Sequence, residues 1–306
     1  MNLQFIFVHG LSGWGSYDKV NKYLPYWGTF KGNLIQFLNK KGYKSYAASV
    51  APEGSTWDRA CELYAQLTGT RVDYGKAHSE RCRHERFGRD FSSEPLIPDW
   101  ESDKKLVLLG HSFGGATIRL FAELLANGSE EERAAAAENE LSGLFKGGLA
   151  DKIHAVITLA APTNGTTAYD LHEDPSFDPS TVKVSKRDER MGNMFSSRKH
   201  AEPDGRIPED YAAFDMHIDN ALELNSSITT LPNVYYFAVP CSTTEPAPDG
   251  SQHPIRKIME GMFRRSSAQM GCYTRHRRIW TKSALHRASG ISARYTGKTI
   301  CLCRVE

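Results

Sequence analysis

The stretch "LVLLGHSFGGATIRLF" at residues 106–121 constrains the fold of this chain more than any other part of the sequence. It begins with a continuous apolar run, which is typical of a strand buried in a parallel sheet. Residues 110–114 then match the pattern G-x-S-x-G, and apolar side chains recur at helical spacing over residues 116–126. In such a strand–turn–helix context this pattern presents a nucleophilic serine, because the glycines let strand and helix approach closely. The stretch therefore predicts an α/β fold with Ser112 as a candidate nucleophile, and an ordinary glycine turn is the alternative.

The rest of the chain supports this fold class. Strand-like and helix-like segments alternate, which indicates a doubly wound, mostly parallel sheet with flanking helices. The predicted strands are 5–9, 46–50, 106–109, 153–160 and 234–239, and the predicted helices surround 32–40, 57–67 and 116–126. Residues 163–226 interrupt the alternation with a polar stretch rich in Asp, Ser and Lys. An interruption of this length in a compact domain indicates either a lid-like insertion or an irregular surface loop.

Composition excludes some classes of partner. The 306 residues carry a formal net charge of only +2, which argues against a nucleic-acid or polybasic membrane partner. No apolar run reaches the roughly 18 residues of a transmembrane segment. The start, "MNLQFIFVHG", lacks the features of a signal peptide, so the chain as it stands is expected to remain inside the cell unless a leader precedes it. The six cysteines form no CxxC pair, which predicts free thiols.

A second glycine-rich loop, "VHGLSGWGS" at residues 8–16, directly follows the first predicted strand. In α/β folds with a nucleophilic turn, such a loop supplies one backbone N–H to an oxyanion hole, and the residue after the nucleophile supplies the other. We therefore predict that the amides of Leu11 and Phe113 bind the negative oxygen of an acyl-transfer intermediate. The loss of one such donor costs about a hundredfold or more in rate. A plain glycine loop is the alternative interpretation.

Imidazole and carboxylate side chains gather in the segment at residues 56–91. Asp58, His78 and His84 are the main candidates for a metal site, with Asp73 and Glu85 nearby. Such a mixed set of nitrogen and oxygen ligands suits Zn²⁺. Taken singly, however, each histidine is more often a surface residue than a ligand, so the residues alone leave both interpretations open.

These segments together resemble one family, the thermostable bacterial triacylglycerol lipases of the Geobacillus and Staphylococcus type, which have the α/β-hydrolase fold. The resemblance is specific because several matching segments are long and unusual, and it covers roughly residues 4–271. The matching segments are "HGLSGWG" at 9–15, "WDRACELYAQL" at 57–67, "VDYGKAHSERCRHERFGR" at 72–89, "GHSFGG" at 110–115, "ENELSGLFKGG" at 138–148, "APTNGTT" at 161–167 and "NVYYFAVP" at 233–240.

The resemblance implies an α/β-hydrolase lipase-like domain over residues 1–271, with 163–226 as its lid-like insertion. It implies hydrolysis of triacylglycerols or other fatty-acyl esters through an acyl-enzyme on Ser112, without an organic cofactor. Members of the family are usually secreted. Phe113 replaces the polar residue that usually follows the nucleophile, but the predicted oxyanion donor is a backbone group and tolerates the change.

The resemblance also implies a structural zinc ion that is bound by two histidines and two aspartates. Asp58, His78 and His84 fall on three of the four matching positions. The fourth ligand comes from a region that is shorter in this chain, where Asp204 or a neighbour is the candidate. We expect no calcium site, because the calcium ligands of the family lie largely beyond the matching region.

A nucleophilic serine also needs a base that takes its proton and an acid that orients the base. The "NDG" and "DH" motifs that carry these residues in the family are absent from this chain. Asp249 with His286 or His276 is a candidate substitute in the right chain order, and a Pro-Asp-Gly turn is the alternative and more common interpretation of Asp249. Residues 272–306 form an atypical basic tail with eight Lys or Arg and one acidic residue. We therefore expect the domain to be incomplete at its C-terminus, through a truncation or a frameshift.

Two further hypotheses remain open at this point. The missing acid and base favour a non-catalytic, truncated or pseudoenzyme homologue that retains the zinc site. An acyltransferase on the same scaffold would use the same serine and differ only in its acceptor.

Overall fold

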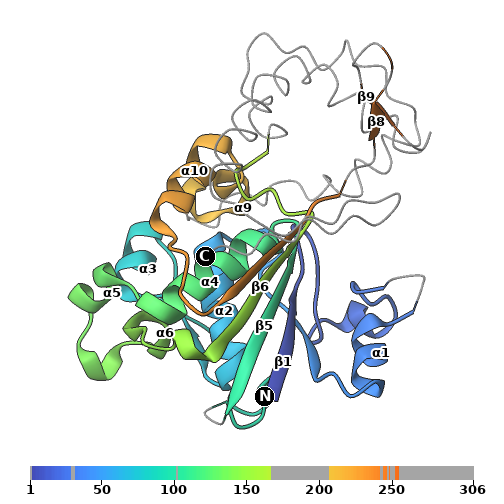
Figure 1. Cartoon of the computed structure of the whole chain (residues 1–306). Coiled ribbons are helices and arrows are strands. Elements are labelled where there is room, and N and C mark those ends of the chain that lie inside the picture. The colour runs from blue at the N-terminus through green and yellow to red at the C-terminus, as the bar shows by residue number, and fades with distance from the viewer. Residues whose placement is uncertain are drawn as a thin grey trace.

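The computed structural model describes residues 2–28, 32–100, 103–166, 207–241, 244–246, 248 and 252–254. Its centre is a five-stranded parallel sheet with the strand order β2-β1-β5-β6-β7 (Figure 1). The strands are β1 (Asn2–Val8), β2 (Ser45–Ala48), β5 (Lys104–His111), β6 (Ile153–Leu159) and β7 (Tyr235–Val239). Each of the five predicted strands corresponds to one of them, so the predicted parallel α/β sheet is confirmed.

Both faces of the sheet are apolar, because successive side chains of a strand point to opposite faces. In β1, Ile6 belongs to the core on one face, whereas Phe7 belongs to the core on the other. The central strand β5 is paired on both sides, and Leu108 lies between Ile6 of β1 and Val156 of β6. This double burial explains why the sequence of β5 is a continuous apolar run rather than an alternating one.

Helices cover the two faces. On one side, α2 (Thr56–Thr68) and α4 (Gly114–Asn127) pack against each other and against the sheet. On the other side, α1 (Leu34–Lys40) covers the sheet together with Trp27 (Figure 1). All three helices that the sequence predicted, around 32–40, 57–67 and 116–126, are present as α1, α2 and α4.

The sequence did not predict the shorter elements, which have between three and seven residues and too little periodicity to be recognised. They are η1 (Lys19–Lys22), β3 (Arg71–Asp73), α3 (Lys76–Cys82), β4 (Phe87–Asp90), α5 (Glu130–Ala135), η3 (Glu138–Glu140), α6 (Gly143–Lys146), η4 (Ala150–Lys152), β8 (Thr244–Pro246) and β9 (Gln252–Pro254).

Residues 207–227, which the sequence assigned to the polar insertion, contain regular structure. They form η6 (Pro208–Asp210), α9 (Ala212–Asp215) and α10 (Ile218–Ser227). An isolated bridge between Gly54 and Tyr211 joins this segment to the start of α2. The interval 163–226 therefore ends in helices that are attached to the core, while residues 167–206 lie outside the described residues.

Several predicted features fall outside the described part of the chain. They are Asp204, Asp249, His276, His286 and the tail 272–306. Within the described part, Cys61, Cys82 and Cys241 are free thiols, as predicted. None of the described helices combines the length and the apolar character that crossing a lipid bilayer requires.

Candidate active site and metal centre

Ser112 lies in the turn between β5 and α4, at the carboxyl end of the central strand. Its φ is +54°, in the left-handed region that non-glycine residues adopt rarely and at a cost. The N–H of Ser112 donates to the carbonyl oxygen of Leu159 at 2.9 Å, which holds the turn against β6. A serine that is held at positive φ on a sharp strand-to-helix turn has the backbone geometry of a nucleophile elbow.

The glycines around this turn allow close contact. A Cβ atom on Gly114 would collide with the carbonyl oxygen of Val8, and one on Gly110 would collide with that of Gly114. A Cβ atom on Gly10 would lie 2.8 Å from the Cβ of Ser112. The loop after β1 therefore lies directly beside the serine, and side chains at these glycines would push the two segments apart.

The backbone amides of this loop and turn differ in whether they already have a hydrogen-bond acceptor. The N–H of Gly10 donates to the Tyr26 hydroxyl at 3.0 Å, and the N–H of Ser12 donates to Pro52 at 2.9 Å. Within the described residues, by contrast, the N–H groups of Leu11 and Phe113 have no hydrogen-bond acceptor. Free amides beside the nucleophile are what an oxyanion hole requires, because they must be available when the carbonyl oxygen becomes negative.

His9 holds the loop in place and is not available as a base. The N–H of Val50 donates to its Nε2 at 3.3 Å, so Nδ1 carries the proton and donates to the carbonyl oxygen of Gly10 at 2.8 Å. Burial, with the nearby charge of Arg59, lowers the pKa of His9 to about 4. The imidazole is therefore neutral at ordinary pH, with both ring nitrogens in use.

Tyr26 links the loop to His111, the residue before Ser112. Its hydroxyl lies 2.6 Å from Nδ1 of His111 and also accepts from Gly10. Burial lowers the pKa of His111, which favours the neutral ring, and an unprotonated Nδ1 accepts a hydrogen bond from the Tyr26 hydroxyl. This chain of contacts ties the position of the loop to that of Ser112.

Arg59 is fully buried between the same segments. Its Nη2 donates to the carbonyl oxygen of His9 at 2.5 Å, and its Nε donates to the hydroxyl of Thr117 in α4 at 3.0 Å. Its Nη1 donates to Ala51 at 3.2 Å. Burial lowers the pKa of Arg59 to about 10, so the group remains charged at neutral pH.

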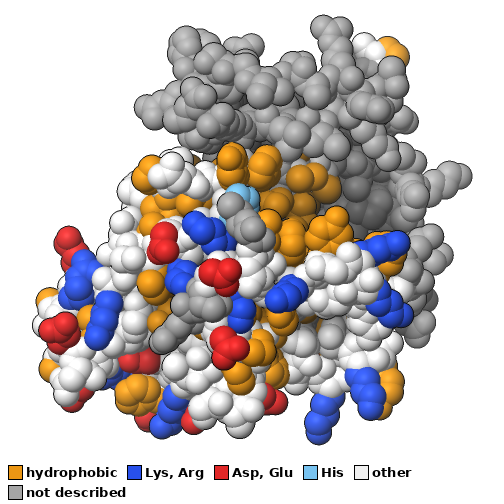
Figure 2. All heavy atoms as spheres, turned by 60° about the horizontal axis from the view of Figure 1, so that its bottom comes forward, with side chains coloured by type: hydrophobic (Ala, Val, Ile, Leu, Met, Phe, Trp, Pro, Cys, Tyr) orange, Lys and Arg blue, Asp and Glu red, His pale blue; other side chains and the backbone are white. Residues whose placement is uncertain are grey.

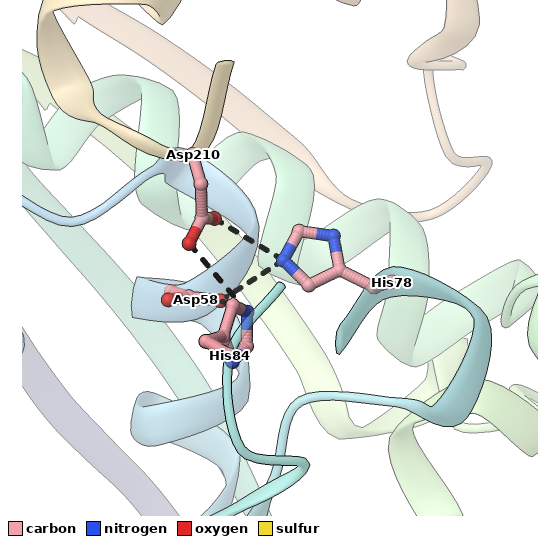
Figure 3. A group of neighbouring side chains, drawn as sticks. All are labelled: Asp58, His78, His84 and Asp210. Atoms are coloured by element: carbon pink, nitrogen blue, oxygen red, sulfur yellow. Dashed lines mark hydrogen bonds and ion pairs between the residues drawn. The ribbon is translucent and has the colours of Figure 1, made fainter. Parts of the chain in front are cut away.

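Four side chains converge at a second place, near the start of α2. Asp58 of α2, His78 of α3, His84 and Asp210 of η6 each offer a ligand atom, and these atoms lie within 4.8 Å of one another (Figure 3). His78 Nε2 lies 3.1 Å from Asp58 Oδ1 and 3.2 Å from Asp210 Oδ1. His84 Nε2 lies 3.5 Å from Asp210 Oδ2 and 3.8 Å from Asp58 Oδ1.

The chemistry of this group fits a metal ion. All four side chains are at most 8% exposed, and His84 Nε2 is buried without a hydrogen bond to any described residue. Burial disfavours protonated His78, but the carboxylates of Asp210 and Asp58 outweigh this effect and raise its pKa. Two buried carboxylates beside two imidazoles concentrate negative charge around the imidazole nitrogens, which a divalent cation would neutralise.

The surrounding residues fix the geometry of this group. The hydroxyl of Ser55 caps α2 by accepting from the N–H of Asp58 at 3.1 Å, and it donates to Asp210 Oδ1 at 2.9 Å. The buried carboxylate of Glu132 accepts from the N–H groups of Ala77 and His78 at the start of α3. These contacts orient both the helices and the ligand side chains.

The sequence named three of the four residues. Asp58, His78 and His84 come together as predicted, but the structure places Asp210 beside them, and Asp204 lies outside the described residues. Asp73 is not part of the group, because Arg86 occupies its carboxylate at 2.8 Å. The run "PEDYAAFD" at residues 208–215 offered a weak signal, since it places acidic residues at the start of a short helix.

The chain is similar to known lipases in sequence and in structure. Residues 2–194 match the family model described as "Lipase-like, C-terminal domain". Lipase 2 of Staphylococcus aureus is 34% identical over 273 residues, which is 81% of this chain and 39% of that protein. Lipase 1 of S. aureus strain MRSA252 is 44% identical over 168 residues, which is 54% of this chain and 24% of that protein. The chain thus spans about two-fifths or less of the length of these relatives.

Solved structures are similar too. The crystal structure of Staphylococcus hyicus lipase matches with a TM-score of 0.64 and 31% identity, covering 83% of this chain and 70% of that one. EstA from Clostridium botulinum matches with a TM-score of 0.69 and 29% identity, covering 98% and 71%. The family model, the relatives and the parallel sheet agree with the family that the sequence resembles. The chain therefore belongs to the lipase-like family of α/β-hydrolases.

Proposed function

We propose that this chain hydrolyses carboxylic esters of fatty acids with Ser112 as the nucleophile. The observation that carries the proposal is the position of Ser112, at positive φ beside the Gly10 loop, with the backbone amides of Leu11 and Phe113 free of any acceptor among the described residues. The relatives named as lipases support fatty-acyl esters as the substrate class.

The proposed reaction passes through an acyl-enzyme. Ser112 Oγ attacks the carbonyl carbon of the ester, and its proton moves to a base. The carbonyl oxygen becomes negative and accepts hydrogen bonds from the two free amides. The intermediate then expels the alcohol, which takes up the proton, and a water molecule repeats the sequence on the acyl group to release the acid. For the base and its orienting acid, the sequence offers His276 or His286 with Asp249, which lie outside the described residues.

For the second site we propose a zinc ion, held by Asp58, His78, His84 and Asp210. Zinc binds both imidazole nitrogens and carboxylate oxygens, and its structural sites have four protein ligands. When four protein ligands surround the ion, no position remains for a substrate, so the zinc would stabilise the fold and take no part in the reaction. It would join α2, α3 and η6, which are distant in the sequence.

A fluorophosphonate ester tests the proposed nucleophile, because such a probe labels a serine only when the protein activates it. We expect intact-mass analysis to show one adduct on the wild type and none on Ser112→Ala. Folded, metal-loaded wild type without an adduct would contradict the hydrolase proposal and leave the non-catalytic homologue. Hydrolysis of a soluble short-chain ester by the two proteins provides the parallel kinetic measurement.

Elemental analysis of the purified protein tests the identity of the metal. We expect about one equivalent of zinc in the wild type and a loss of most of it in Asp210→Ala. A protein that carries calcium or no metal after purification in zinc-containing buffer would overturn the zinc assignment without affecting the nucleophile.

A further inference from the structure

The segment between β1 and β2 has an unusual surface. We call residues 19–28 and 32–44 the basic lobe, because they contain five lysines and no acidic residue, although the whole chain has a net charge of only +2. Figure 1 shows this lobe to one side of the sheet, around α1. All five lysines are exposed; they are Lys19, Lys22, Lys40, Lys41 and Lys44.

The basic lobe also carries most of the exposed apolar side chains of the described residues. Among all described residues, eight large hydrophobic side chains are exposed, and five of these eight lie in the basic lobe. The five are Val20 (44% exposed), Tyr23 (82%), Leu34 (36%), Phe37 (56%) and Tyr43 (53%). Such a concentration on one segment is typical of a surface that binds a partner, whereas scattered exposed residues need no explanation.

The helix α1 shows how the lobe divides its side chains between two faces. Ile35 and Leu38 pack inward against the sheet core formed by Phe7 and Trp27. Leu34 and Phe37 are exposed and stand three residues apart, so they share the outward face of the helix. Leu34 and Phe37 on the outward face therefore do not contribute to the core of this domain. Lysines follow them at the C-terminus of α1.

Lysine and aromatic groups are interleaved in the lobe. The ammonium group of Lys22 lies 5.9 Å from the centre of the Tyr23 ring, and that of Lys41 lies 5.8 Å from the centre of the Phe37 ring. Figure 2 shows lysine and arginine side chains, and no acidic ones, along the edge of the molecule on the side where α1 lies. Exposed apolar groups among positive charges match a surface that has anionic headgroups above a hydrocarbon layer.

The basic lobe adjoins the candidate active site. Tyr26, three residues after Tyr23, contacts Gly10 and His111 through its hydroxyl, next to Ser112. Tyr26 therefore connects the lobe to the candidate nucleophile turn.

We propose that the basic lobe adsorbs the protein to an anionic lipid surface. This inference rests on the proposed function, since it names where that activity takes place. The lysines attract the headgroups over a distance, and Tyr23, Leu34 and Phe37 enter the boundary between headgroups and acyl chains. The low net charge of the whole chain does not oppose this, because attraction to a surface depends on the charges within a Debye length of it.

Co-sedimentation with vesicles of phosphatidylglycerol and phosphatidylcholine tests the proposal on the full chain. We expect binding to mixed vesicles that weakens in high salt and on pure phosphatidylcholine. The double variant Lys40→Gln/Lys41→Gln should bind mixed vesicles about thirtyfold more weakly, since each lysine near such a surface contributes about a factor of five. Tyr23→Ser/Phe37→Ser should weaken binding to both kinds of vesicle by about tenfold.

Matched controls come from the rest of the surface. Phe87 is also an exposed aromatic residue (45%), and Lys146 is an exposed lysine of α6. The double variant Lys146→Gln/Phe87→Ser should bind as the wild type does. The proposal is overturned if the wild type binds no vesicles, if the control variant loses as much binding as the lobe variants, or if the lobe prefers a nucleic acid to the vesicles.

Vesicle co-sedimentation measures adsorption, and fluorophosphonate labelling independently measures the activation of Ser112. Vesicle binding by a protein that the fluorophosphonate does not label would leave the adsorption proposal standing and remove the hydrolase. A protein that the fluorophosphonate labels but that does not bind vesicles would leave the hydrolase proposal standing and overturn the adsorption proposal.

Discussion

The guanidinium carbon of Arg59 lies 4.9 Å from the centre of the Phe113 ring, fully buried beneath the candidate nucleophile turn. The same guanidinium donates to the carbonyl oxygen of His9 at 2.5 Å. Arg59 thus contacts both backbone segments that carry the proposed oxyanion donors. Because Asp58 precedes it in α2, one turn of that helix contributes to the candidate active site and to the candidate metal group.

Replacing Arg59 by Met should damage both stability and reaction. The carbonyl oxygens of His9 and Ala51 would lose their buried donor, at a cost of about 1–3 kcal/mol each. We expect the free energy of unfolding to fall by about 2–4 kcal/mol, and fluorophosphonate labelling to slow by about tenfold or more in protein that remains folded. Denaturant titration and labelling kinetics measure the two effects.

Arg71 is the matched control for this substitution. It lies over the ring of Phe87 in the same way, at 5.3 Å, but it is exposed. Arg71→Met should change the unfolding free energy by less than about 0.5 kcal/mol. Equal behaviour of the two variants would show that Arg59 does not position the loop and the turn.

Removal of the metal should lower the melting temperature strongly. An ion bound at a thousand times its dissociation constant contributes about 4 kcal/mol, which corresponds to a shift on the order of 10 °C. We expect a strong chelator to produce this shift in the wild type and none in Asp210→Ala, which should already melt at the lower temperature. Differential scanning calorimetry makes the comparison, with the exposed Asp151→Ala as the control.

Glu132 should support metal binding although it touches no metal. Its carboxylate, 1% exposed, accepts from the N–H groups of Ala77 and His78 at 3.1 and 2.8 Å and so fixes the start of α3. Glu132→Ala should weaken zinc affinity by about 10–100-fold, as the loss of an orienting partner does in other metal sites. Its neighbour Glu131 is exposed and, among the described residues, pairs with Arg81, so competition titration should find wild-type affinity in Glu131→Ala.

Glu62 should make stability depend on pH. Burial raises the pKa of its carboxyl to about 7, whereas the unfolded value is about 4.3. The stability that protonated Glu62 contributes is therefore fully present below about pH 4.3 and is lost as the pH rises through 7. Compared with the wild type, Glu62→Gln should lose less stability between pH 5 and 8, by on the order of 1–3 kcal/mol.

Urea titrations at several pH values test this prediction. Gln can still accept from the N–H of Ala51 and bond to the Tyr74 hydroxyl, so the packing is kept. The exposed Glu94→Gln is the control and should keep the wild-type profile. Parallel profiles for Glu62→Gln and the wild type would contradict the prediction.

The sequence by itself determined the sheet and indicated the candidate nucleophile turn. The continuous apolar run of β5 and the glycines around Ser112 act between neighbours in the chain, so pattern alone was enough to predict them. The sequence also predicted three of the four residues of the metal group, Asp58, His78 and His84, because they lie in two neighbouring segments, 57–67 and 72–89, that match the family.

Only the tertiary structure decided the rest. Asp210 joins the metal group because Ser55, 155 positions earlier, and the bridge to Gly54 hold η6 against α2. Arg59 has an ordinary helical position in the sequence, and its contacts with His9 and Phe113 exist only when the loop, α2 and α4 meet. The small net charge of the chain gave no indication of the basic lobe. The lobe forms because folding buries Ile35 and Leu38 and leaves Leu34 and Phe37 exposed among the lysines. Contacts between distant segments depend on how the whole chain packs, and local patterns carry no record of them.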